Sequence, residues 1–219
     1  MIVAIDGPAA SGKSTTAKMV AKKLKMTYLD TGAMYRAVTL ALLRSNTDLD
    51  DYDSVCQVVD ELELDIYAQG AKTVVRLDGE DVSQAIRSMQ VTENVSTVST
   101  VKYVREAMVE IQRNIGKKTN CVVEGRDIGT VVFPDAEFKI FMVADVKMRA
   151  ERRLKELHEM GENRSLQEVM TDLKRRDEKD STRSHSPLQK ADEAIEIDTS
   201  MLSIDQQVEK IINLVKKNN

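Results

Sequence analysis

The stretch GPAASGKST, residues 7–15, directly follows the apolar run IVAID, and it decides the fold. The pattern GxxxxGKS is the Walker A phosphate-binding motif, which requires a strand before it and a helix after it. IVAID is a short β-branched run of the kind found in buried parallel strands, and helical spacing predicts a helix from Ser14 to about Lys25. Strand, glycine loop and helix together predict an α/β fold of the P-loop NTPase class.

The motif also predicts a binding site for a nucleoside triphosphate. Backbone N–H groups of the glycine loop point inward, and the N-terminus of the helix adds a partial positive charge. Lys13 is expected to reach the β- and γ-phosphates, and Ser14 to hold Mg²⁺. The residues expected to contact the ATP phosphates are Gly7, Pro8, Ala9, Ala10, Ser11, Gly12, Lys13, Ser14 and Thr15.

The rest of the chain alternates strands and helices, with one interruption. Further strands are expected at TYLD, CVVEG, FKIFMVA and AIEID, and further helices over about 33–44, 101–115, 147–160, 166–180 and 203–217. Such alternation implies a parallel sheet covered by helices on both faces, which makes three layers. The two alternating runs within 62–79 instead predict an antiparallel hairpin, hence an inserted subdomain. We expect one domain over 1–219, with the core at 1–45 and 91–219 and the insert at 46–90.

Composition excludes several functional classes. The net charge is −4 and aromatic residues make up only 4%, which argues against a general nucleic-acid binder. No apolar run approaches the roughly 20 residues that span a bilayer, and no signal segment is expected because a core strand begins at Ile2. Two cysteines without disulfide or metal spacing favour a cytoplasmic protein. The sequence has neither D-x-x-G nor Asn-Lys, so a GTPase switch is excluded.

Two arginine-bearing stretches follow predicted strands. DTGAMYR carries Thr31 and Arg36, and EGRDIGT carries Arg126 and Asp127. In an open parallel sheet, ligands collect at the carboxyl ends of the strands. We therefore expect both stretches to lie near the phosphate loop.

A third stretch, RRDEKDSTR, places Arg176, Asp180 and Arg183 at i, i+4 and i+7, on one face of a predicted helix. A solvated, salt-bridged helix face is one interpretation. The other is a closing lid that excludes water and grips phosphate oxygens, since arginine binds them bidentately. Upstream, RAERR offers three more arginines before the turn HEMGENRS, namely Arg149, Arg152 and Arg153.

The kind of acceptor follows from the charged residues. A hydroxyl acceptor needs a carboxylate base, for which Asp30 and Asp127 are candidates. A phosphate acceptor is already anionic and needs no base, but several cations must offset the repulsion between two polyphosphates. The number of arginines favours the phosphate acceptor. A small-alcohol kinase and a non-catalytic nucleotide-binding module remain alternatives.

The chain resembles the bacterial cytidylate kinase family. IDGPAASGKST, LDTGAMYR, EGRDIGTVVFPDA and RRDEKDSTRSHSPL occur in the order and spacing of that family, and the resemblance spans essentially the whole chain. It implies a five-stranded parallel core, an inserted α+β subdomain that binds the nucleoside monophosphate, and a short helical lid at 151–166. It also implies transfer of phosphate from ATP to CMP or dCMP with Mg²⁺. Neither a nucleic acid nor a membrane is expected as a partner, and a monomer is expected.

The resemblance further implies roles for individual residues. Lys13, Arg126, Arg176 and Arg183 are the implied catalytic residues. The implied CMP-binding residues are Thr31, Arg36, Ser96, Arg105, Arg126, Asp127, Arg176, Asp180 and Arg183. Among these, Ser96, Arg105 and Asp127 would read cytosine, although helix capping is an equal alternative for Ser96. Glu124 stands where a relative in that family has aspartate, and we expect no functional consequence from this difference.

Overall fold

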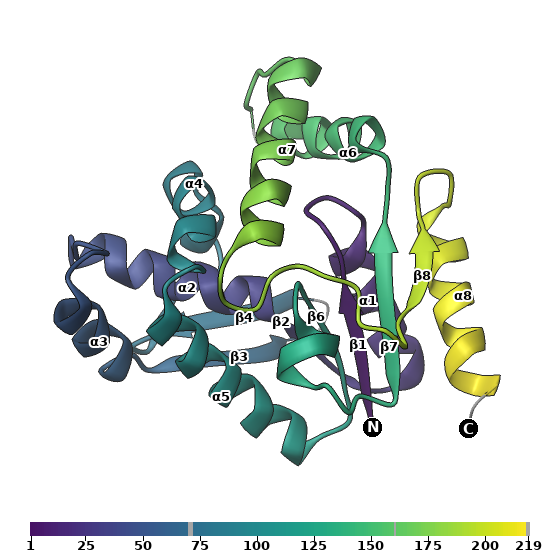
Figure 1. Ribbon diagram of the computed structural model, residues 1–219, viewed down its shortest axis with the longest axis horizontal. Coiled ribbons are helices and arrows are strands. Elements are labelled where there is room, and N and C mark those ends of the chain that lie inside the picture. The colour runs from purple at the N-terminus through teal and green to yellow at the C-terminus, as the bar shows by residue number, and fades with distance from the viewer. Residues whose placement is uncertain (70–71, 160, 218–219) are drawn as a thin grey trace. The chain divides into compact units, whose positions relative to one another are not determined.

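The computed structural model describes residues 1–69, 72–159 and 161–217, which form two compact units. The first unit comprises residues 1–29 and 119–219, and the second comprises residues 30–118. Figure 1 shows the elements of both units with their labels.

The first unit is built on a five-stranded sheet in the order β2-β6-β1-β7-β8. The β1–β6, β1–β7 and β7–β8 pairs are parallel. The central strand β1 carries the IVAID run, which is largely buried, as expected for a strand covered on both faces. The strands are β1 (Ile2–Asp6), β2 (Thr27–Asp30), β6 (Cys121–Gly125), β7 (Phe138–Val143) and β8 (Ile195–Asp198).

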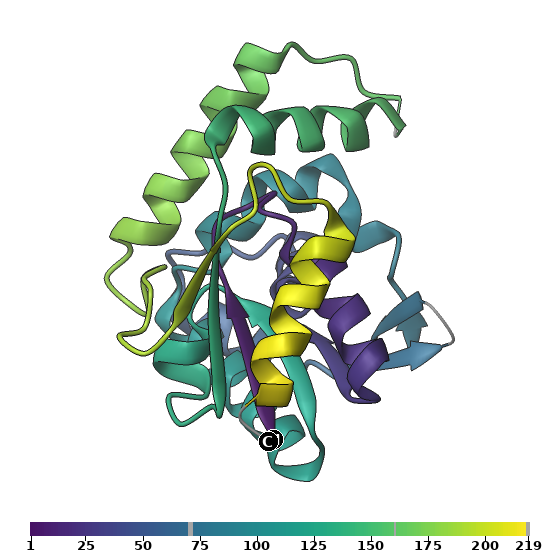
Figure 2. The ribbon, with the colours of Figure 1, turned by 90° about the vertical axis from the view of Figure 1, so that its right-hand side faces the viewer.

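Helices α1 (Lys13–Leu24) and α8 (Ile204–Lys217) pack side by side against this sheet (Figure 2). Their apolar faces and the sheet form one core cluster, in which Val20 of α1 and Ile211 of α8 are fully buried. The core therefore supports the helix that begins at the phosphate loop.

Beyond β7, the chain forms a helical pair, α6 (Val146–Glu159) and α7 (Leu166–Thr182) (Figures 1 and 2). Ser165 caps α7, and its side chain and that of Glu168 exchange hydrogen bonds with each other's backbone N–H. This capping box explains why the helix starts there, because it satisfies two otherwise unpaired N–H groups.

The second unit contains α2 (Thr31–Arg44), a small antiparallel sheet, and helices packed on it. The hairpin expected within 62–79 is confirmed as β3 (Leu64–Gln69) and β4 (Lys72–Leu77), with the short β5 (Glu80–Asp81) added to it. The helical elements are α3 (Tyr52–Asp60), η1 (Ala85–Arg87), α4 (Met89–Val98) and α5 (Lys102–Lys118).

The fold class predicted from the sequence is confirmed, and two local predictions need correction. Helices α3 and α4 were not expected, because Asp51 and Ser88 cap segments that look like polar loops. Arg183 does not share a helix face with Arg176, because α7 ends at Thr182 and Arg183 has an extended backbone. No helix within the described residues is long and apolar enough to cross a membrane.

Candidate active site

The phosphate loop joins β1 to α1 through three residues with positive φ. Gly7, Ala10 and Gly12 have φ values of 149°, 57° and 94°. An L side chain is strained in this region, which explains the two glycines of the motif. These turns bring the loop backbone around the amino end of α1, where a helix offers unpaired N–H groups to an anion.

Gly7 is also required for packing, because a Cβ at this position would lie 2.1 Å from the carbonyl oxygen of Met142 in β7. We expect Gly7→Ala to lower the free energy of unfolding by about 3 kcal/mol or more, since strand and loop must separate to relieve the clash. Urea denaturation followed by circular dichroism measures the loss.

Gly79 is the matched control, because its φ is 80° and a Cβ there would meet no atom within 4 Å. Gly79→Ala should lose only about 1–2 kcal/mol, the cost of a left-handed backbone alone. Equal losses for the two variants would contradict the role given to the Met142 carbonyl.

Lys13 lies inside the loop, where 5% of its surface is exposed. Its Nζ donates to the carbonyl oxygen of Pro8 at 2.7 Å and approaches Ser11 Oγ at 3.5 Å. Burial, together with the positive charges of Arg126 and Arg176, lowers the pKa of Lys13 to about 7. The carboxylates of Glu124 and Asp6 offset these effects only in part, and a phosphate group would supply further negative charge.

Three oxygen-bearing side chains meet at the start of α1, those of Ser14, Tyr28 and Glu124. Ser14 Oγ donates to Glu124 Oε2 at 2.8 Å, and the Tyr28 hydroxyl donates to Glu124 Oε1. Glu124 is the penultimate residue of strand β6 and is 4% exposed. A serine hydroxyl beside a carboxylate is a donor set that suits Mg²⁺, which prefers oxygen ligands and keeps most of its coordination for water and phosphates.

Sequence reasoning expected no consequence from Glu124, and the structure makes it a candidate functional residue. Its position at the carboxyl end of a strand beside the phosphate-loop strand was the available signal. No group of three or more histidine, cysteine, aspartate or glutamate residues gathers as a metal site in the described part of the chain.

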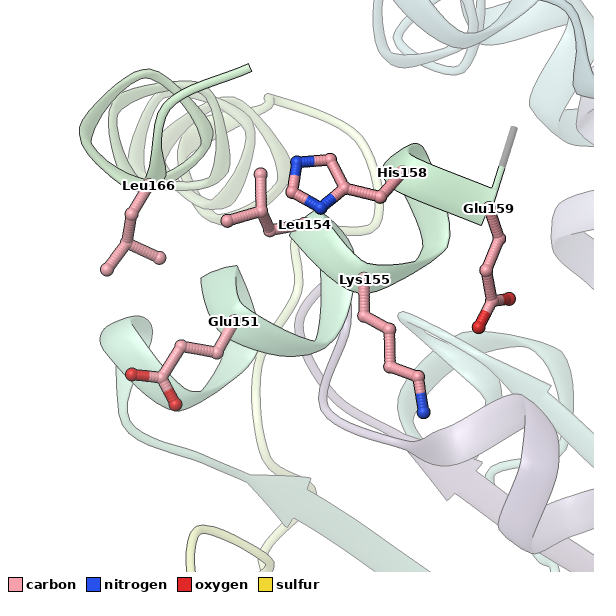
Figure 3. Close-up of a pocket in the computed structure, with 6 residues that line it drawn as sticks. All are labelled: Glu151, Leu154, Lys155, His158, Glu159 and Leu166. Carbon is pink, nitrogen blue, oxygen red and sulfur yellow. The ribbon is translucent and has the colours of Figure 1, made fainter. Parts of the chain in front are cut away.

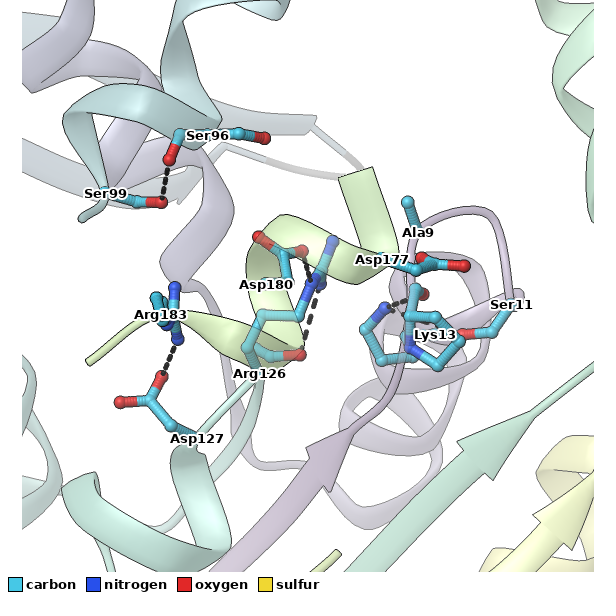
Figure 4. Close-up of polar contacts among 12 residues, drawn as sticks. Ala9, Ser11, Lys13, Ser96, Ser99, Arg126, Asp127, Asp177, Asp180 and Arg183 are labelled. Atoms are coloured by element: carbon cyan, nitrogen blue, oxygen red, sulfur yellow. Dashed lines mark hydrogen bonds and ion pairs between the residues drawn. The ribbon is translucent and has the colours of Figure 1, made fainter. Parts of the chain in front are cut away.

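Arg126 and Asp180 form an ion pair in which Arg126 Nε donates to Asp180 Oδ2 at 2.8 Å (Figure 4). Burial by itself raises the pKa of Asp180, but the charges of Arg126 and Arg176 outweigh burial and hold it below the usual value. Helix α7 is thereby tied to the loop after β6. The pair brings together two residues that lie far apart in the sequence.

A second ion pair joins the same segments. Arg183 Nη2 lies 3.6 Å from Asp127 Oδ1, and both side chains are almost completely buried (Figure 4). Arg183 Nε also donates to the Ser186 carbonyl at 2.7 Å, which holds the chain after α7. The pairing disfavours Asp127 as a general base, because Arg183 already engages its carboxylate.

Asp6, at the end of β1, positions the turn that follows Asp127. Its carboxylate accepts from the backbone N–H groups of Ile128 at 2.8 Å and Gly129 at 2.7 Å. Burial raises the pKa of Asp6 to about 6 despite these two hydrogen bonds. They fix the π-helical turn η2 (Ile128–Val132) and, with it, the preceding Asp127.

Arg152 of α6 binds protein backbone. It donates to the carbonyl oxygens of Ser11, at 3.3 Å, and Thr199. The Thr199 hydroxyl also donates to the Ser11 carbonyl, at 2.8 Å. Arg152 therefore stabilises the backbone of the phosphate loop. The spacing of residues in the sequence does not reveal this role.

The second unit carries Thr31 and Arg36 on helix α2. Thr31 is buried at its first position, after Asp30, whose Oδ1 accepts from Ala33 N at 2.9 Å. Arg36 Nη1 donates to Thr92 Oγ1 at 2.9 Å and to the Ile86 carbonyl at 3.3 Å. Because Asp30 caps the helix, its carboxylate is engaged and disfavoured as a base.

Arg105 and Ser96 also belong to the second unit. Arg105 is 3% exposed, donates to the Ser99 carbonyl at 3.2 Å, and lies over the Tyr35 ring at 5.3 Å. Ser96 lies inside α4, and its carbonyl oxygen accepts from the Ser99 hydroxyl at 3.0 Å. The N-cap of α4 is Ser88, so the capping role considered for Ser96 is wrong.

A pocket of about 510 Å³ opens along α6 and the start of α7 (Figure 3). Charged side chains of α6 surround an apolar floor that includes Leu154 and Leu166. Its lining contains none of the residues that the sequence analysis singled out as catalytic or substrate-binding.

The fold and the site of the first unit define a P-loop kinase: a phosphate loop at the start of α1, with Lys13 inside it and Arg126 held to α7 by Asp180. The chain belongs to the cytidylate kinase family, whose family model matches residues 3–217.

Similarity to known proteins supports both the fold class and the family. A cytidylate kinase of Clostridioides difficile is 46% identical over 215 residues, which cover 98% of each chain. One of Fusobacterium nucleatum is 50% identical over 217 residues, covering 99% of this chain and 96% of the relative. The solved shikimate kinase of Bacteroides thetaiotaomicron shares 12% identity with a TM-score of 0.50, covering 99% of this chain and 98% of the other, and shows the fold alone. The resemblance found in the sequence is confirmed, and the non-catalytic alternative is wrong.

Proposed function

We propose that this chain transfers the γ-phosphoryl group of ATP to CMP and dCMP, giving ADP and CDP or dCDP. Membership of the cytidylate kinase family makes the chain a kinase with ATP as phosphoryl donor. The observation that carries the mechanism is the set of cations in the first unit. Lys13 lies in the phosphate loop, the charges of Arg126 and Arg176 act on it, and Arg183 is paired with Asp127.

The reaction needs charge neutralisation more than proton transfer. An oxygen of the CMP phosphate attacks the γ-phosphorus, and the bond from that phosphorus to the β–γ bridging oxygen breaks, leaving ADP. The attacking oxygen is already anionic, so no general base is required. Lys13, Arg126, Arg176 and Arg183 stabilise the negative charge spread over the transferred group.

Mg²⁺ is part of the proposal. Ser14 and Glu124 would hold it, and when bound it supplies positive charge to the phosphate oxygens. Tyr28 orients the Glu124 carboxylate for this role through its hydroxyl.

The substrate residues carried over from the family remain proposals. Arg126 binds the phosphate of CMP, Asp127 reads cytosine, and Asp180 binds the ribose hydroxyl. In the second unit we assign Thr31, Arg36, Ser96 and Arg105 to CMP, with 46–90 as the nucleotide-binding insert and 151–166 as the lid. We further infer a monomer that acts in the cytoplasm and binds no nucleic acid.

The test is ADP release from ATP and Mg²⁺, coupled to NADH oxidation, with CMP, dCMP, UMP, AMP and GMP offered in parallel. Turnover with CMP and dCMP alone is expected. Equal turnover with UMP would contradict cytosine reading by Asp127 and Arg105, because a carboxylate accepts from the cytosine amine and uracil has none there. No turnover with any of the five would contradict the proposed function.

A further inference from the structure

One buried guanidinium joins three segments of the first unit. Arg149, on the first turn of α6, is 6% exposed. Its Nη1 donates to the carbonyl oxygen of Ala9 in the phosphate loop at 3.2 Å and lies 2.7 Å from Asp177 Oδ2 on α7. Its Nε donates to the Ala144 carbonyl, just beyond β7, at 3.0 Å. These donors bind protein atoms, so Arg149 links the phosphate loop to helix α7.

Apolar packing connects the same two segments. Ala9, at the crest of the phosphate loop, is buried in a cluster with Ala150 of α6 and Leu173 of α7. The loop crest therefore contacts the helical pair through a methyl group and, on the same residue, through a carbonyl held by Arg149. The phosphate loop and the helical pair are therefore joined by two kinds of contact at one residue.

Asp177 lies on α7 beside the residues that we assign to the reaction. It directly follows Arg176 and precedes Asp180 by one turn. Asp180 ties α7 to Arg126, which we assign to the substrate phosphate, so substrate competes with that tie. The ion pair between Asp177 and Arg149 uses no residue assigned to substrate, so substrate does not compete with it.

We propose that Asp177 and Arg149 are positioning residues that couple occupancy of the phosphate loop to the placement of α7. A nucleotide that stabilises the phosphate loop therefore also stabilises α7, and with it Arg176 and Asp180, through the Ala9 carbonyl, Arg149 and Asp177. The inference rests on the proposed function in requiring that the loop bind ADP or ATP.

The test is hydrogen–deuterium exchange of α7, with and without ADP and Mg²⁺, on the full chain and two variants. Asp177→Asn keeps the shape of the side chain and removes its charge. The matched control is Asp172→Asn on the same helix, because Asp172 also forms a 2.7 Å ion pair, with Arg164, that does not reach the phosphate loop.

ADP is expected to slow exchange of the α7 amides about 10-fold in the unchanged chain and in Asp172→Asn, and by less than about twofold in Asp177→Asn. Steady-state kinetics provide the second measurement. Asp177→Asn should lower kcat about 10- to 100-fold with little change in the KM for CMP, because Arg176 is misplaced while the CMP-binding residues remain.

Arg149→Lys is a second variant that keeps the proposal testable if Asp177→Asn does not fold. It preserves the charge beside Asp177, but its single nitrogen cannot replace both Nε and Nη1 of Arg149, which donate to the Ala144 and Ala9 carbonyl groups. Protection by ADP should therefore fall in this variant too. Unchanged protection in the two variants, or equal loss in Asp172→Asn, would overturn the proposal. Calorimetry separates the causes of failure. If the unchanged chain binds ADP without protecting α7, the coupling alone is wrong; if it binds no ADP, the proposed function fails with it.

Discussion

Replacing Arg176 by alanine is expected to lower kcat about 10³-fold, the range measured for arginines that stabilise charge during phosphoryl transfer. Arg176 is half-buried on α7, and its charge acts on both Lys13 and Asp180, whose pKa values it lowers. A transferring phosphoryl group beside Lys13 would feel the same charge. Coupled ADP release with saturating CMP measures the loss.

The fold should survive this change. Removing Arg176 reduces repulsion with Lys13 and leaves the Arg126–Asp180 and Arg149–Asp177 ion pairs in place. Arg175→Ala is the matched control, because the Arg175 side chain is 79% exposed and pairs only at the surface with Asp172. Near-normal turnover in Arg176→Ala, or an equal fall in Arg175→Ala, would refute the role given to Arg176.

Lys13→Met is expected to have two opposite effects. It should lower kcat about 10³-fold, because the removed ammonium group lies where phosphate charge develops. It should also raise the free energy of unfolding of the nucleotide-free protein by roughly 1–3 kcal/mol, since a pKa shift of one unit corresponds to about 1.4 kcal/mol and part of the gain is lost with the hydrogen bond to Pro8. Kinetics and urea denaturation measure the two effects.

The stabilisation should depend on pH in a defined direction. The pKa of Lys13 falls from 10.5 to about 7 on folding, so the unfolded chain binds more protons between these values. Below pH 7 the lysine is charged in both the folded and the unfolded state, so the full free-energy cost of burying its ammonium group is present. As pH rises toward 10.5 the cost disappears, and the advantage of Lys13→Met should shrink.

Lys18 on the same helix is exposed and is the control for this experiment. Lys18→Met should change neither turnover nor the pH dependence. A Lys13→Met variant that is less stable than the unchanged chain at pH 6 would contradict the unfavourable burial of the ammonium group.

Most strands, the helix after the phosphate loop and the hairpin of the second unit were predictable because their signals are local. The β-branched run before the glycine loop, the helical spacing after it and the alternation around 62–79 each depend on a few neighbouring residues. Helices α3 and α4 escaped prediction because they are short and rich in β-branched residues, which have low helix propensity, so packing decides such segments more than propensity.

Residues of the candidate site were likewise predictable only where a local motif carries them. Lys13 and Ser14 were identified by a motif whose geometry is built into nine consecutive residues. The extended backbone of Arg183 could not be predicted from the sequence. An i, i+7 spacing assumes that the helix continues, but α7 stops one residue before Arg183. The partner of Glu124 could not be inferred either, because Ser14 lies 110 positions away in the chain.

By itself, the sequence determined the class of fold, the phosphate loop and, through its motifs, the family. Tertiary structure alone decided how the charges are shared: Asp180 with Arg126, Asp127 with Arg183, and Asp177 with Arg149. The physical reason is that an ion pair acts over a few ångströms in space, whatever the distance along the chain. Spacing shows which side chains carry charge, and only the packed helices and strands show which charges meet.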